Sequence, residues 1–208
     1  MPILELDHLV LGAASLADGA SALAARFGVE PDAGGRHEGY GTHNRLLSLG
    51  RQTYLELIAP DPGQPTPDRP RPFGLDDPAV AERISRRPRL LAYVVRTDDI
   101  AAAREALGLP PGRAFDMRRG SLQWKISLPV QGQPVGTPIL IDWGDTPNPS
   151  STLPDRGLRL VGFRIGVPAA TAKLLAPLAA DPRIRIEPAD EFELHASVDA
   201  PAGIIELD

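Results

Sequence analysis

The sequence lacks cysteine, has few aromatic residues and contains no long apolar run. Without cysteine there can be no disulfide and no thiolate metal or redox site. Aromatic residues make up 5% of the 208 residues, so aliphatic side chains must fill most of the core. No apolar run approaches the roughly 18 residues that a membrane-spanning helix needs. The first ten residues are acidic rather than basic, so we expect no signal peptide, a cytoplasmic location and no membrane partner.

Charge is also limited: the formal net charge is −5, and the arginines are scattered along the chain. A nucleic-acid surface is usually a basic face, so we expect no nucleic-acid partner. The length and the ordinary share of hydrophobic residues, 42%, favour one compact soluble domain with a sizeable core.

Residues 41–61 stand out, because two apolar-rich strands flank a Gly50-Arg51 turn and carry polar side chains inside them. His43, Arg45 and Glu56 lie among hydrophobic neighbours, where charged groups are costly to bury without partners. A carboxylate within the segment Tyr-Leu-Glu-Leu-Ile therefore predicts a salt bridge, a metal ligand or a substrate contact.

The hairpin ends a unit of one strand, one helix and three strands, and this pattern recurs. The first unit is predicted to have a strand at 3–12, a helix at 14–27, a weak edge strand or loop at 31–39, and strands at 42–49 and 52–59. The second unit is predicted to have a strand at 90–95, a helix at 98–108 and strands at 113–117, 122–128 and 137–143. A third unit is predicted to have a strand at 158–167, a helix at 168–179 and strands at 183–187, 191–198 and 203–207. The predicted units are 1–60, 89–146 and 147–208, with a proline-rich linker and a short helix at 61–88.

Several segments, in this order, resemble the glyoxalase-like domain family of the vicinal oxygen chelate superfamily: LDHLVLGA (6–13), GTHNRLLSLG (41–50), YLELIAPD (54–61), LQWKISLP (122–129) and LIDWGD (140–145). The resemblance implies an α+β fold in which β-α-β-β-β modules form a cup-shaped mixed sheet with helices on its outer face. It also implies that the cup binds a small oxygen-bearing molecule. The expected activity is that of a lyase, an isomerase or a dioxygenase that uses a divalent metal such as Mn, Fe or Zn.

His8 and Glu56 match the family's ligand positions in the first unit. An offset of 84 residues places Leu140 where the second unit would supply its carboxylate, and Asp142 lies two residues further on the same face. The predicted metal ligands are therefore His8, Glu56 and Asp142, with Glu56 also as the catalytic base. If units one and three pair instead, Glu206 replaces Asp142.

A rival explanation needs no metal. If Gly50-Arg51 is a two-residue turn, Arg45 lies directly opposite Glu56 and forms a cross-strand ion pair. The chain would then be a non-catalytic binding protein, in which His43 and Arg45 complement a small acidic ligand.

Tyr54, in the same hairpin, and Trp124, in the second unit, are further candidates for substrate binding. Arg118 and Arg119 are predicted to form a solvated turn. Which units pair to close the cup stays open, and pairing across a homodimer is a third arrangement.

Overall fold

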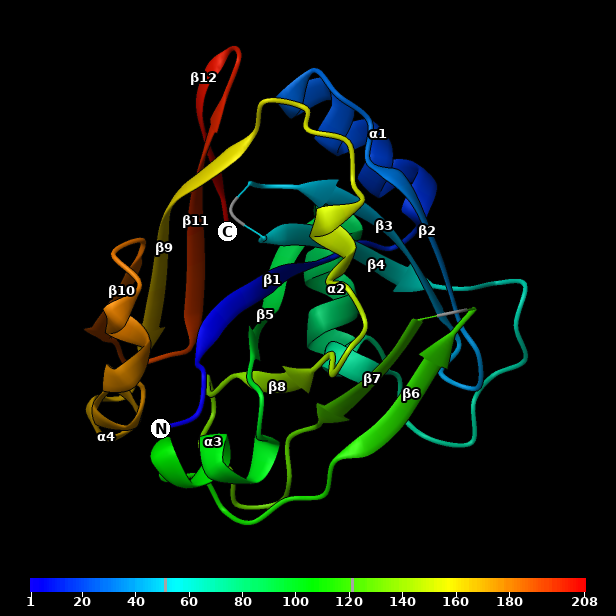
Figure 1. The fold of residues 1–208 in the computed structure, drawn as a ribbon. Helices are drawn as coiled ribbons and strands as arrows, with labels where there is room; N and C mark the ends of the chain where they lie inside the picture. The colour runs from blue at the N-terminus through cyan, green and yellow to red at the C-terminus, as the bar shows by residue number, and fades with distance from the viewer. Residues whose placement is uncertain (51, 121) are drawn as a thin grey trace.

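A computed structural model describes residues 1–50, 52–120 and 122–208 of the protein. Its strands form two sheets, one of eight strands in the order β2-β3-β4-β1-β5-β8-β7-β6 and one of four in the order β10-β9-β11-β12 (Figure 1). The large sheet is strongly curved, so that its edge strands β2 and β6 approach each other. This arrangement confirms the predicted α+β fold with a cup-shaped mixed sheet.

The first two units supply the eight strands. Unit one contains β1 (Glu5–Gly12), α1 (Leu16–Phe27), β2 (Asp32–His37), β3 (Thr42–Ser48) and β4 (Tyr54–Pro60). Unit two contains β5 (Arg89–Arg96), α3 (Ile100–Ala106), β6 (Phe115–Arg119), β7 (Leu122–Ser127) and β8 (Ile139–Asp142). They join through the antiparallel pair β1 and β5, and in each unit the first strand runs parallel to the last. Between them lie a short helix, η1 (Pro72–Gly74), and α2 (Pro78–Arg86).

The helices begin where short polar side chains can accept the free backbone amides of the first turn. The Ser15 side chain caps α1 and the Asp77 side chain caps α2. Helix α3 begins at Ile100 rather than at 98 as predicted, because Asp99 is the N-cap and accepts from two amides of the first turn. Asp98 instead accepts a hydrogen bond from the backbone of Ile3, which fastens the N-terminal segment to this corner.

The third unit repeats the element order but not the strand order. It contains β9 (Arg159–Val167), α4 (Ala169–Leu174), β10 (Ile184–Pro188), β11 (Glu193–Ala200) and β12 (Gly203–Leu207), with short helices η2 (Pro149–Ser151) before it and η3 (Ala176–Ala180) after α4. Here the first strand, β9, lies between β10 and β11, and β10 and β12 form the two edges of the sheet. Units one and two therefore close the cup, and the third unit forms a separate sheet beside it (Figure 1).

The two faces of the large sheet have different roles. On the outer face Leu9, Tyr93 and Val95 pack with α1, α3 and the third unit, and the Tyr93 ring meets Phe163 edge to face at 5.4 Å between centroids. The inner face carries a second, smaller apolar cluster. Alternation along each strand thus places one set of side chains in the main core and the other inside the cup.

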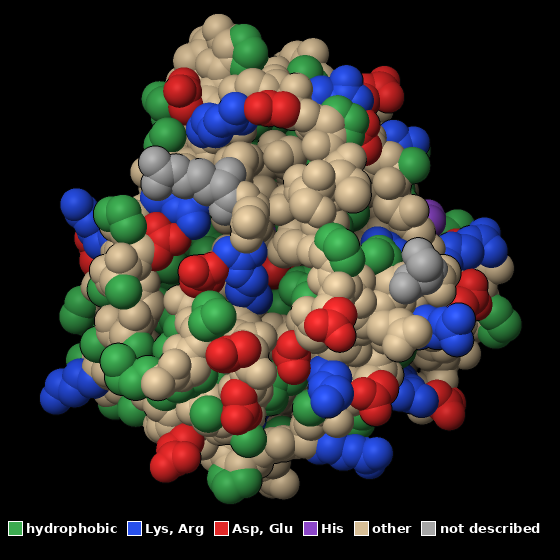
Figure 2. Space-filling model, in the orientation of Figure 1, with side chains coloured by type: hydrophobic (Ala, Val, Ile, Leu, Met, Phe, Trp, Pro, Cys, Tyr) green, Lys and Arg blue, Asp and Glu red, His purple; other side chains and the backbone are tan. Residues whose placement is uncertain are grey.

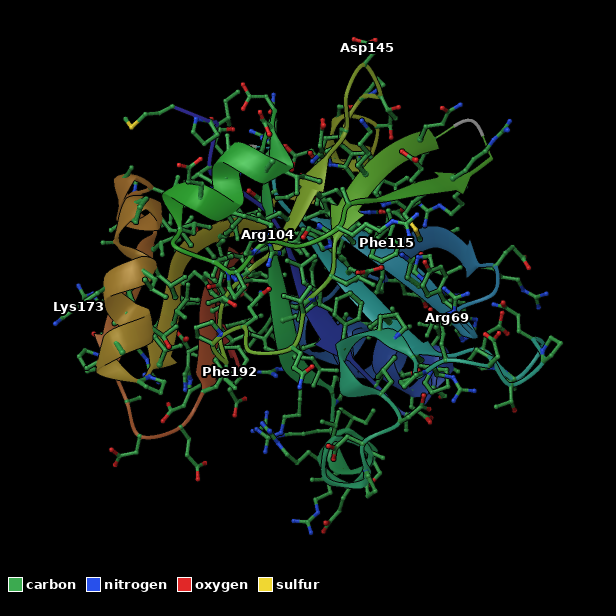
Figure 3. The ribbon with its side chains drawn as sticks, turned by 90° about the horizontal axis from the view of Figure 1, so that it is seen from below. Arg69, Arg104, Phe115, Asp145, Lys173 and Phe192 are labelled. Carbon is green, nitrogen blue, oxygen red and sulfur yellow. The ribbon has the colours of Figure 1, made fainter. Side chains whose placement is uncertain are left out.

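The surface matches the expectation from composition on the face drawn in Figure 2, where acidic and basic side chains are interspersed. Figure 3 shows Lys173 pointing outward from α4, whereas Arg104 points inward from α3. Within the described ranges, no helix is both long and apolar enough to cross a membrane.

Candidate functional site

A cavity inside the cup brings together buried polar side chains from both units. Glu56 on β4 lines this cavity and is 6% exposed. Asn44 Nδ2 donates to Glu56 Oε1 at 2.6 Å, and His8 Nε2 lies 3.5 Å from Glu56 Oε2. His37 Nε2 lies 3.8 Å from Glu56 Oε1. The carboxylate is thus surrounded by side chains from β1, β2 and β3.

His8 is held from behind by the preceding residue, Asp7. The His8 Nδ1 atom lies 2.6 Å from Asp7 Oδ1, while Asp7 Oδ2 accepts from Trp143 Nε1 at 3.0 Å and Asn148 Nδ2 at 2.5 Å. Consecutive residues of a strand normally face opposite sides, but the β1–β5 pairing shifts its register between Leu6 and His8. Such a bulge re-aims side chains, and here it allows Asp7 and His8 to act as one unit.

These contacts set the charges at the centre of the cavity. Burial alone would lower the pKa of His8, but the hydrogen bond to Asp7 and the proximity of Glu56 outweigh it and raise the pKa to about 9. Burial alone would raise the pKa of Glu56, but His8, His37 and Asn44 together lower it to about 2. His8 is therefore an imidazolium and Glu56 a carboxylate at neutral pH.

His37 has the opposite character. Burial lowers its pKa below the usual histidine value, which favours the neutral ring. The second amide hydrogen of Asn44 can point to His37 Nε2, 3.2 Å from Asn44 Nδ2, and His37 Nδ1 lies 2.9 Å from Thr42 Oγ1. A neutral ring protonated on Nδ1 satisfies both contacts.

Two glycines on β2 make room for this network. A Cβ at Gly34 would overlap Asn44, and a Cβ at Gly35 would lie 2.7 Å from Arg119 Cδ. The β2–β3 register also shifts at these residues. Asn44 Oδ1 consequently accepts from Gly35 N at 2.9 Å and from Arg119 Nη1 at 3.2 Å, which links β6 of unit two to the Glu56 network of unit one.

Apolar and aromatic side chains complete the walls. The His8 ring stacks on Tyr54 at 4.5 Å between centroids, and burial raises the pKa of the Tyr54 hydroxyl well above its usual value. The ring centroids of Trp124 and Trp143 lie 5.4 Å apart, and both side chains belong to the wall that unit two supplies. Phe73, from the proline-rich connection, also lines the cavity and has a φ of 61°, a strained value for a bulky residue.

The cavity brings together part of the predicted site. His8, Glu56, Tyr54 and Trp124 line it, as expected of ligand-contacting residues, although their roles remain predictions.

His43 and Arg45 alternate with the cavity-lining residues of β3 and lie on the outer face. His43 Nδ1 is 3.9 Å from Asp61 Oδ1, and Arg45 Nη1 donates to the Pro31 carbonyl at 3.4 Å.

The predicted pairing of Arg45 with Glu56 is wrong by one residue. The observed partners are Arg45 with Leu57 and Leu46 with Glu56. The connection is longer than two residues, because Leu49 N bonds to Thr53 O rather than pairing with Gln52. Gly50 is described, whereas Arg51 lies outside the described residues. A one-residue slip exchanges the two faces of a strand, so Arg45 points away from the cup.

Asp142 also lies away from the cavity. Ile141 and Trp143 line it, while Asp142 Oδ1 accepts from Gly144 N. The offset of 84 residues is wrong by one residue for the last strand, so Leu140 and Asp142 share the outer face. Glu206 lies on β12 of the separate sheet, where its carboxylate accepts from the Ser197 hydroxyl.

Sequence reasoning missed three polar residues of the cavity, namely His37, Asn44 and Arg119. Arg119 lines the cavity, which corrects its assignment to a solvated turn. Asn44 could have been found from the correct hairpin register, since it shares a face with Leu46, the partner of Glu56. His37 and Arg119 come from the edge strands, and only the curvature of the sheet brings them together.

Comparison with known proteins supports the fold. The glyoxalase-like domain family matches residues 6–179. A hypothetical protein from Staphylococcus aureus superposes with a TM-score of 0.63 at 14% identity, over 99% of each chain. A mutant 4-hydroxymandelate synthase from Streptomyces coelicolor gives 0.52 at 16% identity, over 100% of this chain and 63% of that one.

Methylmalonyl-CoA epimerase from Mycobacterium tuberculosis gives a TM-score of 0.44 at 16% identity, over 71% of this chain and 92% of that one. No curated protein matches the sequence significantly. At these identities the structural likenesses show the fold alone, whereas the family match covers most of the chain. The chain therefore belongs to the glyoxalase-like domain family, as its sequence predicted.

Proposed function

We propose that this protein binds a small, largely apolar molecule in the cup and holds a hydroxyl group of that molecule between His8 and Glu56. The observation that carries the proposal is the buried pair of His8 Nε2 and Glu56 Oε2, 3.5 Å apart in a cavity with aromatic walls. That separation is longer than a normal hydrogen bond. An oxygen can lie about 2.8 Å from both atoms.

A hydroxyl fits this position better than other oxygen groups. The imidazolium of His8 donates a hydrogen bond, and the carboxylate of Glu56 can only accept one. A hydroxyl oxygen accepts from the first and donates to the second, whereas a ketone leaves Glu56 without a new partner. Buried, charged groups in an apolar cavity are costly for stability, which favours a functional role for the pair.

The divalent metal implied by the family resemblance does not fit the residues present. Asp142, the predicted third ligand, lies on the outer face, and the inner face of β8 offers Ile141 in its place. His8 and His37 approach different oxygens of Glu56. Among the described residues, no three His, Asp or Glu side chains are placed to share a metal ion.

Binding can be measured through the protein's own fluorescence, because both of its tryptophans, Trp124 and Trp143, line the cavity. We expect 3-hydroxyhexanoate to change the emission with saturation, and hexanoate, which lacks the hydroxyl, to bind about tenfold more weakly. Glu56→Gln should remove this preference, and the exposed Glu206→Gln should leave it intact. Equal affinity for the two compounds in the wild-type protein would refute the proposal.

A proton-transfer enzyme of the lyase or isomerase type is a second candidate, favoured by the order Asp7, His8, Glu56. Asp7 fixes the Nδ1 side of His8, so Nε2 faces the ligand as a proton donor, and Glu56 can receive a proton. Proton NMR of 3-hydroxyhexanoate in D₂O with the protein would show deuterium incorporation or a new product. Unchanged spectra would favour binding without turnover.

A further inference from the structure

Arg119 brings to the cavity a positive charge that no carboxylate of the described residues neutralises. It is the last residue of β6 and lines the cavity, with its side-chain stem against Gly35. Within the described part of the chain its guanidinium makes one hydrogen bond, from Nη1 to the neutral amide oxygen of Asn44. A guanidinium has five N–H donors, so the described residues use only a small part of its capacity.

Other arginines of this protein have fuller sets of partners. Arg159 forms two hydrogen bonds to the carboxylate of Asp155. Arg104 is 3% exposed and lacks an acidic partner among the described residues, but Pro110, Ser127 and Gln133 accept from it. Arg26, Arg45 and Arg118 also make one hydrogen bond each within the described structure, but to backbone carbonyls and outside the cup cavity, so Arg119 differs from them in facing the cavity.

The acids of the cavity have partners of their own. Glu56 is engaged by Asn44 and His8, and Asp7 by His8, Trp143 and others. Neither acid is within ion-pair distance of Arg119 in the described structure, so an incoming anion would not have to displace an existing one. Arginine suits a carboxylate because the two planar groups can form paired hydrogen bonds.

We propose that Arg119 binds a carboxylate of the ligand, and hence that the ligand is a small hydroxy acid with an apolar body. This inference rests on the proposed function, because the hydroxyl is the group assigned to His8 and Glu56. The carboxylate then lies toward β2 and β6, where Arg119 approaches Gly35, and the apolar body faces Trp124 and Trp143.

The test uses three probes on the full chain, with isothermal titration calorimetry as the measurement. 3-Hydroxyhexanoate carries both groups, hexane-1,3-diol lacks the carboxylate, and hexanoate lacks the hydroxyl. We expect the wild-type protein to bind the hydroxy acid at least about tenfold more tightly than the diol. If the hydroxy acid binds no more tightly than the diol, the inference is overturned. This comparison needs only the wild-type protein.

Variants then assign the effect to the residue. Arg119→Gln should weaken binding of the hydroxy acid by about tenfold to a hundredfold and change diol binding less than about twofold. Arg119→Lys, which keeps the charge, should recover part of the affinity. The control is Arg118→Gln, since Arg118 is the neighbouring arginine on the exposed side of β6 and should affect neither probe.

The outcomes separate the two proposals. If Arg119→Gln weakens both probes equally, Arg119 only braces β6 against Asn44, and the inference is wrong. If hexanoate binds as tightly as 3-hydroxyhexanoate but still depends on Arg119, the carboxylate site stands and the hydroxyl assignment fails. Absence of binding by all three probes up to about 10 mM would overturn both.

Discussion

Replacing Glu56 by glutamine tests the electrostatics of the cavity, because the two side chains have the same shape and differ in charge. Glutamine keeps an oxygen for Asn44 and loses the attraction to the imidazolium of His8. The pKa of Glu56 is lowered from 4.5 to about 2, a shift that corresponds to about 3 kcal/mol of favourable interaction in the folded state. We expect Glu56→Gln to lower the free energy of unfolding by about 2–3 kcal/mol at pH 6.

The pH dependence gives this prediction its sign. The pKa of His8 is raised from 6.5 to about 9, so its contribution to stability is complete below pH 6.5 and is lost as the pH rises through 9. The lowered pKa of Glu56 gives a contribution that is complete above pH 4.5 and is lost as the pH falls through 2. Both contributions are therefore complete between pH 4.5 and 6.5.

Urea unfolding followed by circular dichroism at pH 6 and pH 10 measures the effect. At pH 10 His8 is neutral in the wild-type protein, so the difference between wild type and Glu56→Gln should fall below about 1 kcal/mol. Glu206→Gln, an exposed control, should differ from wild type by less than about 0.5 kcal/mol at either pH. An equal loss at both pH values would show that shape rather than charge sets the cost, and would refute the reasoning.

Three further predictions concern the walls and the chemistry of the cup. Gly34→Ala should lower the free energy of unfolding by about 2 kcal/mol, because a Cβ there would overlap Asn44. The control is Gly162→Ala, which should change this free energy little because the nearest atom to its Cβ would be 3.5 Å away. Thermal unfolding compares the two variants. In urea unfolding Phe73→Gly should be more stable than Phe73→Ala by about 1 kcal/mol, since glycine adopts the φ of 61° without strain, and the reverse order would exclude strain there. Calorimetric titration with Mn²⁺, Fe²⁺ or Zn²⁺ should give no tight one-to-one binding, and one tightly bound equivalent would contradict the account of the donor set.

Much of the fold could be predicted from the sequence because its signals are local. Apolar periodicity gave the strands, and short polar side chains that can cap a first turn lie at the starts of α1 and α2. The duplication of one strand, one helix and three strands was visible as a repeat in the chain. Whether the third unit joins the cup could not be predicted from the sequence. Its order of elements along the chain matches that of the other two units, and only its order of strands in the sheet differs.

The errors at the site came from register, which local patterns do not specify. The loop at Gly50 is one residue longer than assumed, and this moved Arg45 to the wrong face. A one-residue error in the offset between units one and two likewise placed Asp142 on the wrong face of its strand. Because the side-chain period of a strand is two, each small error in length exchanged the inside and the outside of the cup.

The missed residues depend on long-range geometry. His37 lies in a polar, glycine-rich segment with weak strand character, and Arg119 lies at the end of a short strand. They enter the same cavity because the sheet curves until β2 and β6 meet. The glycines that allow this approach resemble ordinary loop residues in the sequence.

The central claim is that a ligand hydroxyl lies between His8 and Glu56. A crystal structure of the protein with 3-hydroxyhexanoate tests it most directly. The account predicts the hydroxyl oxygen about 2.8 Å from both His8 Nε2 and Glu56 Oε2. A ligand bound elsewhere, or one whose hydroxyl points away while His8 and Glu56 keep their present contact, would contradict it.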